Sequence, residues 1–124
     1  MRTTTQLTES LGKMQAYLET PVGDDPQGLI DRTELLTILI AKSGQCLAEA
    51  KYIQDQLINE GLMEAIGQEL DKKLSPSLIT KFVSSNAKDI NYLVTWADRI
   101  NAAATHQLDG LRSIISYKKA ELNL

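Results

Sequence analysis

The chain has 124 residues, of which 43% are hydrophobic, and a net charge of −3, which suits one domain over residues 1–124 with a modest core. Its one cysteine, Cys46, excludes an internal disulfide and a cysteine-based zinc site, and favours a reducing, cytoplasmic compartment. No apolar run approaches the ~20 residues needed to cross a membrane, and residues 1–10 have no apolar signal core, so we expect a soluble protein.

The N-terminal part predicts a short helix followed by a loop. Over residues 4–19, leucine or methionine recurs at steps of four, three and four residues, which places Leu7, Leu11, Met14 and Leu18 on one helical stripe. Residues 20–28, TPVGDDPQG, contain two prolines and two glycines, which are typical of a loop.

A long helix is expected over residues 31–60. Asp31 and Glu34 have the spacing of a capping box, and Gly61 supplies a stop signal after Asn59 and Glu60. Between these signals a strict repeat of three and four residues predicts one buried stripe, made of Leu36, Leu39, Ser43, Cys46, Ala50, Ile53 and Leu57.

Two short helices, over residues 62–73 and 76–84, and a second long helix over residues 87–121 complete the prediction. Pro76 after Ser75 is a preferred helix start, and Asn86 can cap the last helix. The last helix has an apolar stripe of Leu93, Ala97, Ile100, Ala104, Leu108, Leu111 and Ile115. The expected fold is therefore all-α: an elongated, coiled-coil-like bundle of about five helices with two long antiparallel helices.

The length of the last helix predicts self-association. About 35 helical residues span about 52 Å, whereas a compact chain of this size has a radius of gyration of about 14 Å. The projecting stripe would face water unless the other long helix, together with another copy of the chain, covers it. Each long helix also has a second stripe of small residues, with Gly44 on one helix and Gly110 near His106 on the other. A glycine costs a helix about 1 kcal/mol, so these positions indicate close approach of a neighbouring helix, with tolerated surface glycines as the alternative.

His106 is the only histidine, and its neighbours do not predict catalysis or metal binding. Asp109 lies one helical turn away, but Thr105 is adjacent to His106 and points in a different direction, so a nucleophile and a base would not meet. The position three residues before His106 is Ala103 rather than the glutamate of a di-iron helix. We expect a protein that is not an enzyme and has no metal or cofactor.

Charge divides the chain into an acidic and a basic half. Residues 1–71 contain 12 acids and 5 bases, whereas residues 72–124 contain 4 acids and 8 bases. Basic residues interleaved with aromatic rings suit single-stranded nucleic acid. The candidates for such contacts are Lys81, Lys88, Arg99, Arg112, Lys118, Lys119, Tyr92 and Trp96. The alternative is that the two halves pair with each other and the aromatic rings pack inside the bundle.

The segment SPSLITKFVSSNAKDINYLVTWADRINAAATHQLDGLRSIISYKKAEL resembles the C-terminal part of small helical proteins of tailed phages and prophages, most closely in YLVTWADRIN, THQLDGLRS and ISYKKAE. A tryptophan-containing helix that leads into a basic end is also similar to the T4-type recombination mediator. That resemblance implies an oligomeric helical protein that binds single-stranded DNA, with a recombinase and single-strand-binding proteins as partners.

These observations lead to one principal prediction and one alternative. The principal prediction is a non-enzymatic, self-associating helical protein of phage or prophage origin that acts through protein contacts. The alternative is a single-stranded-DNA-binding recombination mediator.

Overall fold

The computed structural model describes residues 1–72 and 75–122, and within them the chain forms four helices and no strand. The helices are α1 (Thr4–Leu18), α2 (Pro26–Lys72), α3 (Pro76–Asn86) and α4 (Lys88–Leu122). The predicted all-helical class is confirmed, but the described part of the chain contains four helices rather than about five. Among these helices, none combines the length and the apolar character that crossing a membrane would require.

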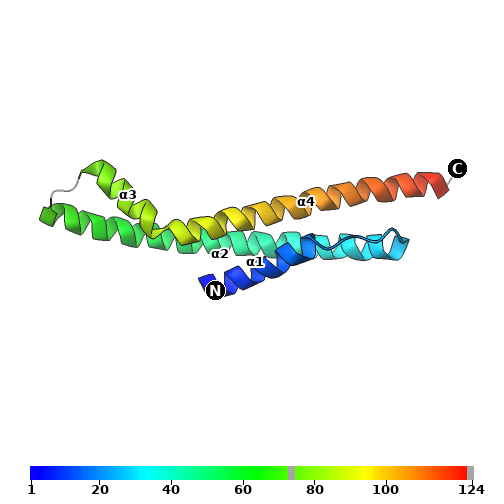
Figure 1. Cartoon of the computed structure of the whole chain (residues 1–124), viewed down its shortest axis with the longest axis horizontal. Coiled ribbons are helices and arrows are strands. Elements are labelled where there is room, and N and C mark those ends of the chain that lie inside the picture. The colour runs from blue at the N-terminus through cyan, green and yellow to red at the C-terminus, as the bar shows by residue number, and fades with distance from the viewer. Residues whose placement is uncertain (73–74, 123–124) are drawn as a thin grey trace.

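The two long helices α2 and α4 lie side by side and run in opposite directions (Figure 1). At 1.5 Å per residue, the 47 residues of α2 span about 70 Å and the 35 residues of α4 about 52 Å. Helix α1 packs against the middle of this pair, and α3 packs against the C-terminal end of α2. The molecule is therefore an elongated bundle, three helices thick only at its centre.

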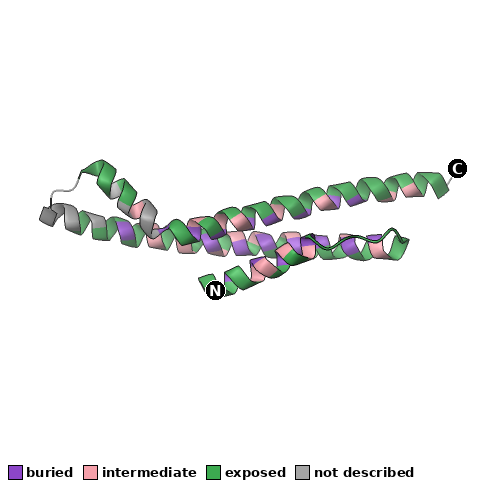
Figure 2. Ribbon diagram, in the orientation of Figure 1, coloured by how far each residue is buried: buried purple, intermediate pink, exposed green. Residues whose placement is uncertain are grey.

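The core follows the seam between the helices, where the buried residues form a narrow band (Figure 2). Six residues of the predicted α4 stripe are buried there and Ile115 packs against them, so one chain covers most of this stripe. The partners come from the stripes predicted for α1 and α2. The buried residues of these stripes are Leu7, Leu11, Met14, Leu18, Leu36, Leu39, Ser43, Cys46 and Ala50 from α1 and α2, with Leu93, Ala97, Ile100, Ala104, Leu108 and Leu111 from α4.

Helix α1 begins with a reciprocal cap. The hydroxyl oxygen of Thr3 accepts a hydrogen bond from the Gln6 backbone N–H at 3.2 Å, and the Gln6 side-chain oxygen accepts one from the Thr3 N–H at 2.9 Å. These contacts satisfy two donors that the first turn would leave unpaired.

Helix α2 begins five residues earlier than predicted. Asp25 precedes the first helical residue, Pro26, and its carboxylate accepts a hydrogen bond from the Gly28 N–H at 3.0 Å. The predicted start at Asp31 is wrong, because Asp31 lies inside the helix, where it accepts a hydrogen bond from Gln27 at 2.9 Å. An acidic cap followed by proline is a strong helix start even within a glycine-containing stretch.

The predicted break at Gly61 is also wrong, because α2 continues without interruption to Lys72. The residues assigned to a separate helix over 62–73 belong to α2 as far as Lys72, and residue 73 lies outside the described residues. Gly61 is buried at the end of α2 against which α3 packs. A single glycine costs a helix interior about 1 kcal/mol, so one glycine does not by itself end a helix.

The last two helices begin close to their predicted positions. Helix α3 starts at Pro76 and continues two residues past the predicted end, so Asn86 is its last residue rather than the cap of α4. Helix α4 begins at Lys88, one residue later than predicted, and Ala87 alone separates the two helices.

Candidate interaction surfaces

Trp96 lies at the contact between α4 and α1 rather than on a free surface. Its indole N–H donates a hydrogen bond to the side-chain oxygen of Gln15 at 3.2 Å. The edge of the ring lies 4.0 Å from the position that a Cβ atom on Gly12 would occupy. Tyr92, one turn earlier, is 66% exposed, and its ring centroid lies 5.9 Å from that of Trp96 with the planes tilted by 47°. Of the two aromatic candidates, Tyr92 presents the free ring.

The structure brings only some of the basic candidates together. Lys88 and Arg99 are exposed and share one stripe of α4 with Tyr92. Arg112 lies about 140° from Arg99 around the helix axis, at 100° per residue. It lies 4.0 Å from the carboxylate of Asp109.

The remaining basic candidates lie near the two ends of the molecule. Lys118 donates a hydrogen bond to the backbone carbonyl of Asp24 at 2.9 Å, close to the exposed Lys119 at the end of α4. Lys81 is exposed on α3, near the opposite end of the molecule. These side chains do not form one continuous basic track with Lys88 and Arg99.

The small-residue stripes have different surroundings on the two long helices. A Cβ atom added to Gly44 would lie 3.9 Å from the Asn101 amide nitrogen, so this glycine faces α4 of the same chain. A Cβ atom added to Gly110 would meet nothing within 4 Å. His106 is exposed on the same helix. Within the chain, Gly44 is therefore near a helix contact, whereas Gly110 and His106 lie on open surface.

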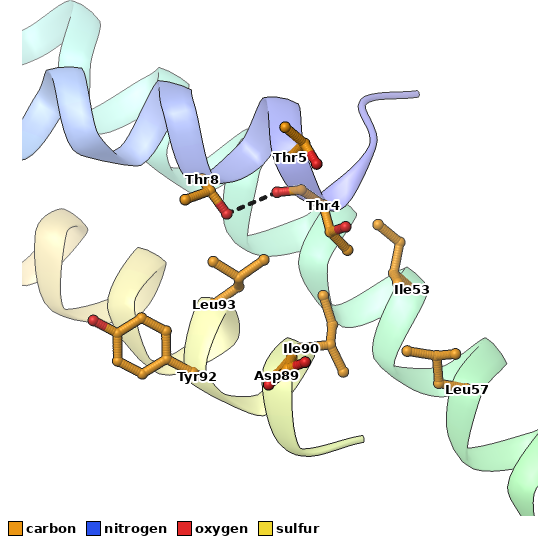
Figure 3. Close-up of a pocket in the computed structure, with 9 residues that line it drawn as sticks. All are labelled: Thr4, Thr5, Thr8, Ile53, Leu57, Asp89, Ile90, Tyr92 and Leu93. Atoms are coloured by element: carbon orange, nitrogen blue, oxygen red, sulfur yellow. Dashed lines mark hydrogen bonds between the residues drawn. The ribbon is translucent and has the colours of Figure 1, made fainter. Parts of the chain in front are cut away.

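A groove opens beside the N-terminus of α1, where α2 and α4 continue past the end of this shorter helix (Figure 3). Its volume is about 610 Å³. The lining residues come from three helices: Thr4, Thr5 and Thr8 from α1, Ile53 and Leu57 from α2, and Asp89, Ile90, Tyr92 and Leu93 from α4. The hydroxyl of Thr8 donates to the Thr4 carbonyl at 2.8 Å, so it is already engaged. Aliphatic side chains from α2 and α4 form much of this lining, and Asp89 is its one carboxylate.

The part of the chain that the structure describes contains no candidate metal site. No three histidine, cysteine, aspartate or glutamate side chains gather there in a way that could hold a metal ion.

A buried arginine is the main polar feature that the sequence analysis missed. Arg32 is only 6% exposed. Its guanidinium donates to the Thr20 hydroxyl at 2.7 Å, the Leu18 carbonyl at 3.3 Å and the Gln107 side-chain oxygen at 2.9 Å. It also lies over the Tyr17 ring, 4.3 Å from the centroid. The cation thus meets the partial negative charge at the C-terminal end of α1 and links α1, α2 and α4.

A second polar contact ties the N-terminus to α2. The Arg2 guanidinium forms a salt bridge with Glu49, in which Nε donates to the carboxylate at 2.7 Å. This hydrogen bond raises the pKa of Arg2 above its usual value. Cys46, one turn earlier on α2, is completely buried. Burial raises the pKa of its thiol, and the nearby Arg2 partly offsets this effect.

The surface of α2 that points away from α4 exposes large apolar side chains. Leu35 is 47% exposed and Ile38 is 51% exposed. They lie beside a shallow groove of about 200 Å³ between α1 and α2, whose lining also includes Lys13, Tyr17 and Lys42. We call Glu34, Leu35, Ile38 and Lys42 the outer face of α2.

No family model, curated protein or solved structure matches the chain. The resemblance to phage proteins therefore stays a prediction.

Proposed function

We propose that the protein is a non-enzymatic helical protein that self-associates and acts through protein–protein contacts. Its accessible surface supports this proposal. The chain of 13.7 kDa exposes 8380 Å². A compact folded monomer of this mass exposes about 6600 Å². The excess of about 1800 Å² on one chain is larger than the roughly 600–1,000 Å² that each partner contributes to a specific protein interface.

The chemical character of the exposed surface points in the same direction. Large hydrophobic side chains are exposed along both long helices, at Ile30, Leu35, Ile38, Tyr52, Leu62, Met63, Ile66, Tyr92, Ile114 and Tyr117. Scattered exposed hydrophobic residues are ordinary, but their repetition along an elongated bundle with a thin core favours association.

Sedimentation equilibrium of the purified chain between about 1 and 200 µM tests the proposal. We expect an average mass that rises with concentration to a multiple of 13.7 kDa. A mass equal to one chain throughout this range would exclude self-association as the basis of function.

The origin in a tailed phage or prophage, and a cytoplasmic location, belong to the same proposal. The resemblance of the segment from Ser75 onward to phage proteins supports this origin. The chain has a single cysteine and so cannot form an internal disulfide, which supports a reducing compartment.

A second candidate function is binding of single-stranded DNA by a recombination mediator. It is favoured by the grouping of the exposed Lys88, Tyr92 and Arg99 on one stripe of α4. Two cations can contact phosphates while the tyrosine ring stacks on a base, which contributes about 1–3 kcal/mol.

Fluorescence anisotropy of a labelled oligothymidylate at 20 and 150 mM salt tests this second candidate. Binding should weaken steeply with salt, and Tyr92→Ala should reduce affinity about tenfold or more. Tyr52→Ala, at a tyrosine on α2 that is 53% exposed, is the matched control and should leave binding unchanged. Absence of any anisotropy change at 20 mM salt would eliminate the mediator function.

A further inference from the structure

The outer face of α2 has charges arranged symmetrically about an exposed apolar residue. Ile38 is 51% exposed at its centre. Glu34 lies four residues before it and Lys42 four residues after it, and both are exposed. At 1.5 Å per residue the two charges are therefore about 6 Å from Ile38 along the helix, in opposite directions.

Neither charge has an obvious partner on its own helix. The positions three and four residues away from Glu34 hold Ile30, Asp31, Thr37 and Ile38, and those around Lys42 hold Ile38, Leu39, Gln45 and Cys46. The two charges are themselves about 12 Å apart. Among residues 1–72 and 75–122, the salt bridges join Arg2 to Glu49 and Arg112 to Asp109, so neither Glu34 nor Lys42 takes part in one.

We infer that this face binds the same face of a second copy of the chain, with the two α2 helices antiparallel and a two-fold axis at Ile38. The inference rests on the proposed self-association and names the surface that carries it. A two-fold contact brings the same patch from both subunits together, so the patch must be complementary to itself.

The outer face of α2 meets this requirement. Reversal about Ile38 places Glu34 level with Lys42 of the partner subunit, and Lys42 level with Glu34 of the partner subunit. The two exposed isoleucines meet at the centre and remove each other from water. Two reciprocal ion pairs then flank an apolar contact, which is the usual arrangement of a polar rim around an apolar centre.

The neighbouring apolar surface extends the contact on one side of the axis. Leu35 is 47% exposed and lies at the edge of the groove of about 200 Å³ between α1 and α2. A two-fold axis of this kind places the grooves of both subunits on the same side of the helix pair. Lys13 and Lys42 line this groove together with the apolar residues Met14, Ile38 and Leu39.

Reciprocal charge exchange tests the inference. Glu34→Lys gives a chain in which both flanking charges are positive, and Lys42→Glu gives one in which both are negative. Each variant alone should have a dissociation constant for self-association at least tenfold higher than that of the native chain. The double variant E34K/K42E restores both pairs and should return to within about threefold of the native value.

Mixing the two single variants gives the most specific result. An equimolar mixture of E34K and K42E chains should form a mixed dimer, because each positive face then meets a negative one. Analytical ultracentrifugation with one variant fluorescently labelled measures this directly. Circular dichroism spectra that match the native chain show that the single variants remain folded.

Cysteine cross-linking supplies a measurement that does not depend on charge. In a Cys46→Ala background, Ile38→Cys should give a covalent dimer under mild oxidation, because a residue on a two-fold axis meets its own copy. Ala102→Cys, at an exposed position on α4, is the control and should stay mostly unlinked.

The possible outcomes separate this inference from the proposed function. If the native chain associates but both charge variants associate equally well, the interface lies elsewhere, so the inference fails and the proposed function stands. If the native chain is monomeric at all concentrations, both fail. Efficient capture of a different protein by the Ile38 face of a monomeric chain would likewise overturn the inference.

Discussion

Arg32 shows how one residue can hold three helices together. Its guanidinium contacts the end of α1 at Leu18, the following turn at Thr20, and Gln107 on α4. A buried cation is costly unless its environment compensates for the lost hydration. Here carbonyl, hydroxyl and amide oxygens together with the Tyr17 ring offset part of that cost, while Nε has no hydrogen-bond partner among the described residues.

Removal of the Arg32 guanidinium should destabilise the bundle strongly. Arg32→Met keeps an apolar stem but leaves buried oxygen atoms without donors, so we expect the free energy of unfolding to fall by about 2–4 kcal/mol. Urea denaturation at one fixed protein concentration measures this change. Arg99→Met, at an exposed arginine on α4, is the control, with a change within about 0.5 kcal/mol. Equal effects of the two substitutions would contradict the role assigned to Arg32.

The sequence contained a signal for Arg32 that composition and motif analysis passed over. The repeat of three and four residues that marks the buried stripe of α2 starts at Leu36, and one further step of four reaches Arg32. A charged residue in a core register predicts an unusual buried contact. Its partners could not be predicted, because Gln107 lies 75 residues away in the chain.

The buried thiol of Cys46 gives a pH-dependent prediction. Burial raises the pKa of this thiol in the folded protein. The raised pKa stabilises the fold fully below the ordinary thiol pKa, and this contribution is lost as the pH rises through the raised value. We expect Cys46→Ala to remove this part of the alkaline fall in stability, measured by thermal unfolding from pH 7 to pH 10.

Chemical labelling checks the same property of Cys46. At pH 8 the native thiol should react with iodoacetamide at least tenfold more slowly than the thiol of the urea-unfolded chain, because alkylation needs an accessible thiolate. Equal rates in both states would show that Cys46 is accessible in the folded protein.

At the scale of the element, helix type was predictable while helix limits were less so. Apolar spacings over α1, α2 and α4 predicted the buried stripes, because only a helix brings those positions to one side. The predicted helix ends were wrong where two local sequence signals competed. Asp25 and Asp31 both precede a suitable first turn, and glycine at position 61 can end a helix or lie within one.

The true start of α2 can be tested with a pair of aspartate substitutions. Asp25→Ala removes the side chain that accepts from the Gly28 N–H, and we expect a loss of about 1 kcal/mol in the free energy of unfolding. Asp31→Ala removes only an exposed contact with Gln27, so its effect should stay within a few tenths of a kcal/mol. Denaturant unfolding of both variants checks the prediction, and the reverse order of effects would place the start at Asp31.

The candidate surfaces were predictable in part. The interleaving of basic and aromatic residues predicted Lys88, Tyr92 and Arg99 as candidates, and all three are exposed on one stripe of α4. The same analysis could not tell that the Trp96 ring packs toward α1, since that contact depends on Gln15 from the other end of the chain.

At the scale of the whole molecule, the prediction that two long helices pack together is confirmed. Their lengths set the shape. A compact chain of this size has a radius of gyration of about 14 Å, whereas a rod as long as α2, about 70 Å, has one of about 20 Å.

Small-angle X-ray scattering measures this shape in solution. We expect a maximum dimension of at least about 70 Å at every concentration, because association cannot shorten the helices. A maximum dimension near 40 Å would show that α2 is broken. The Gly61→Pro variant, which interrupts the helix within α2, is a useful comparison, since it should shorten or bend the particle.

Small side chains fill the middle of the seam, where Ser43, Cys46 and Ala50 of α2 and Ala97 and Ala104 of α4 are all fully buried. Both long helices extend for several turns beyond this region, so it sets the angle at which α2 and α4 cross. A bulkier residue here, such as leucine in place of the buried Ala97, would increase the local distance between α2 and α4 by a small amount. A small change in the crossing angle displaces the far ends of α2 and α4 more than their centres. The distance between surfaces at those ends therefore depends on a few small side chains in the middle of the seam.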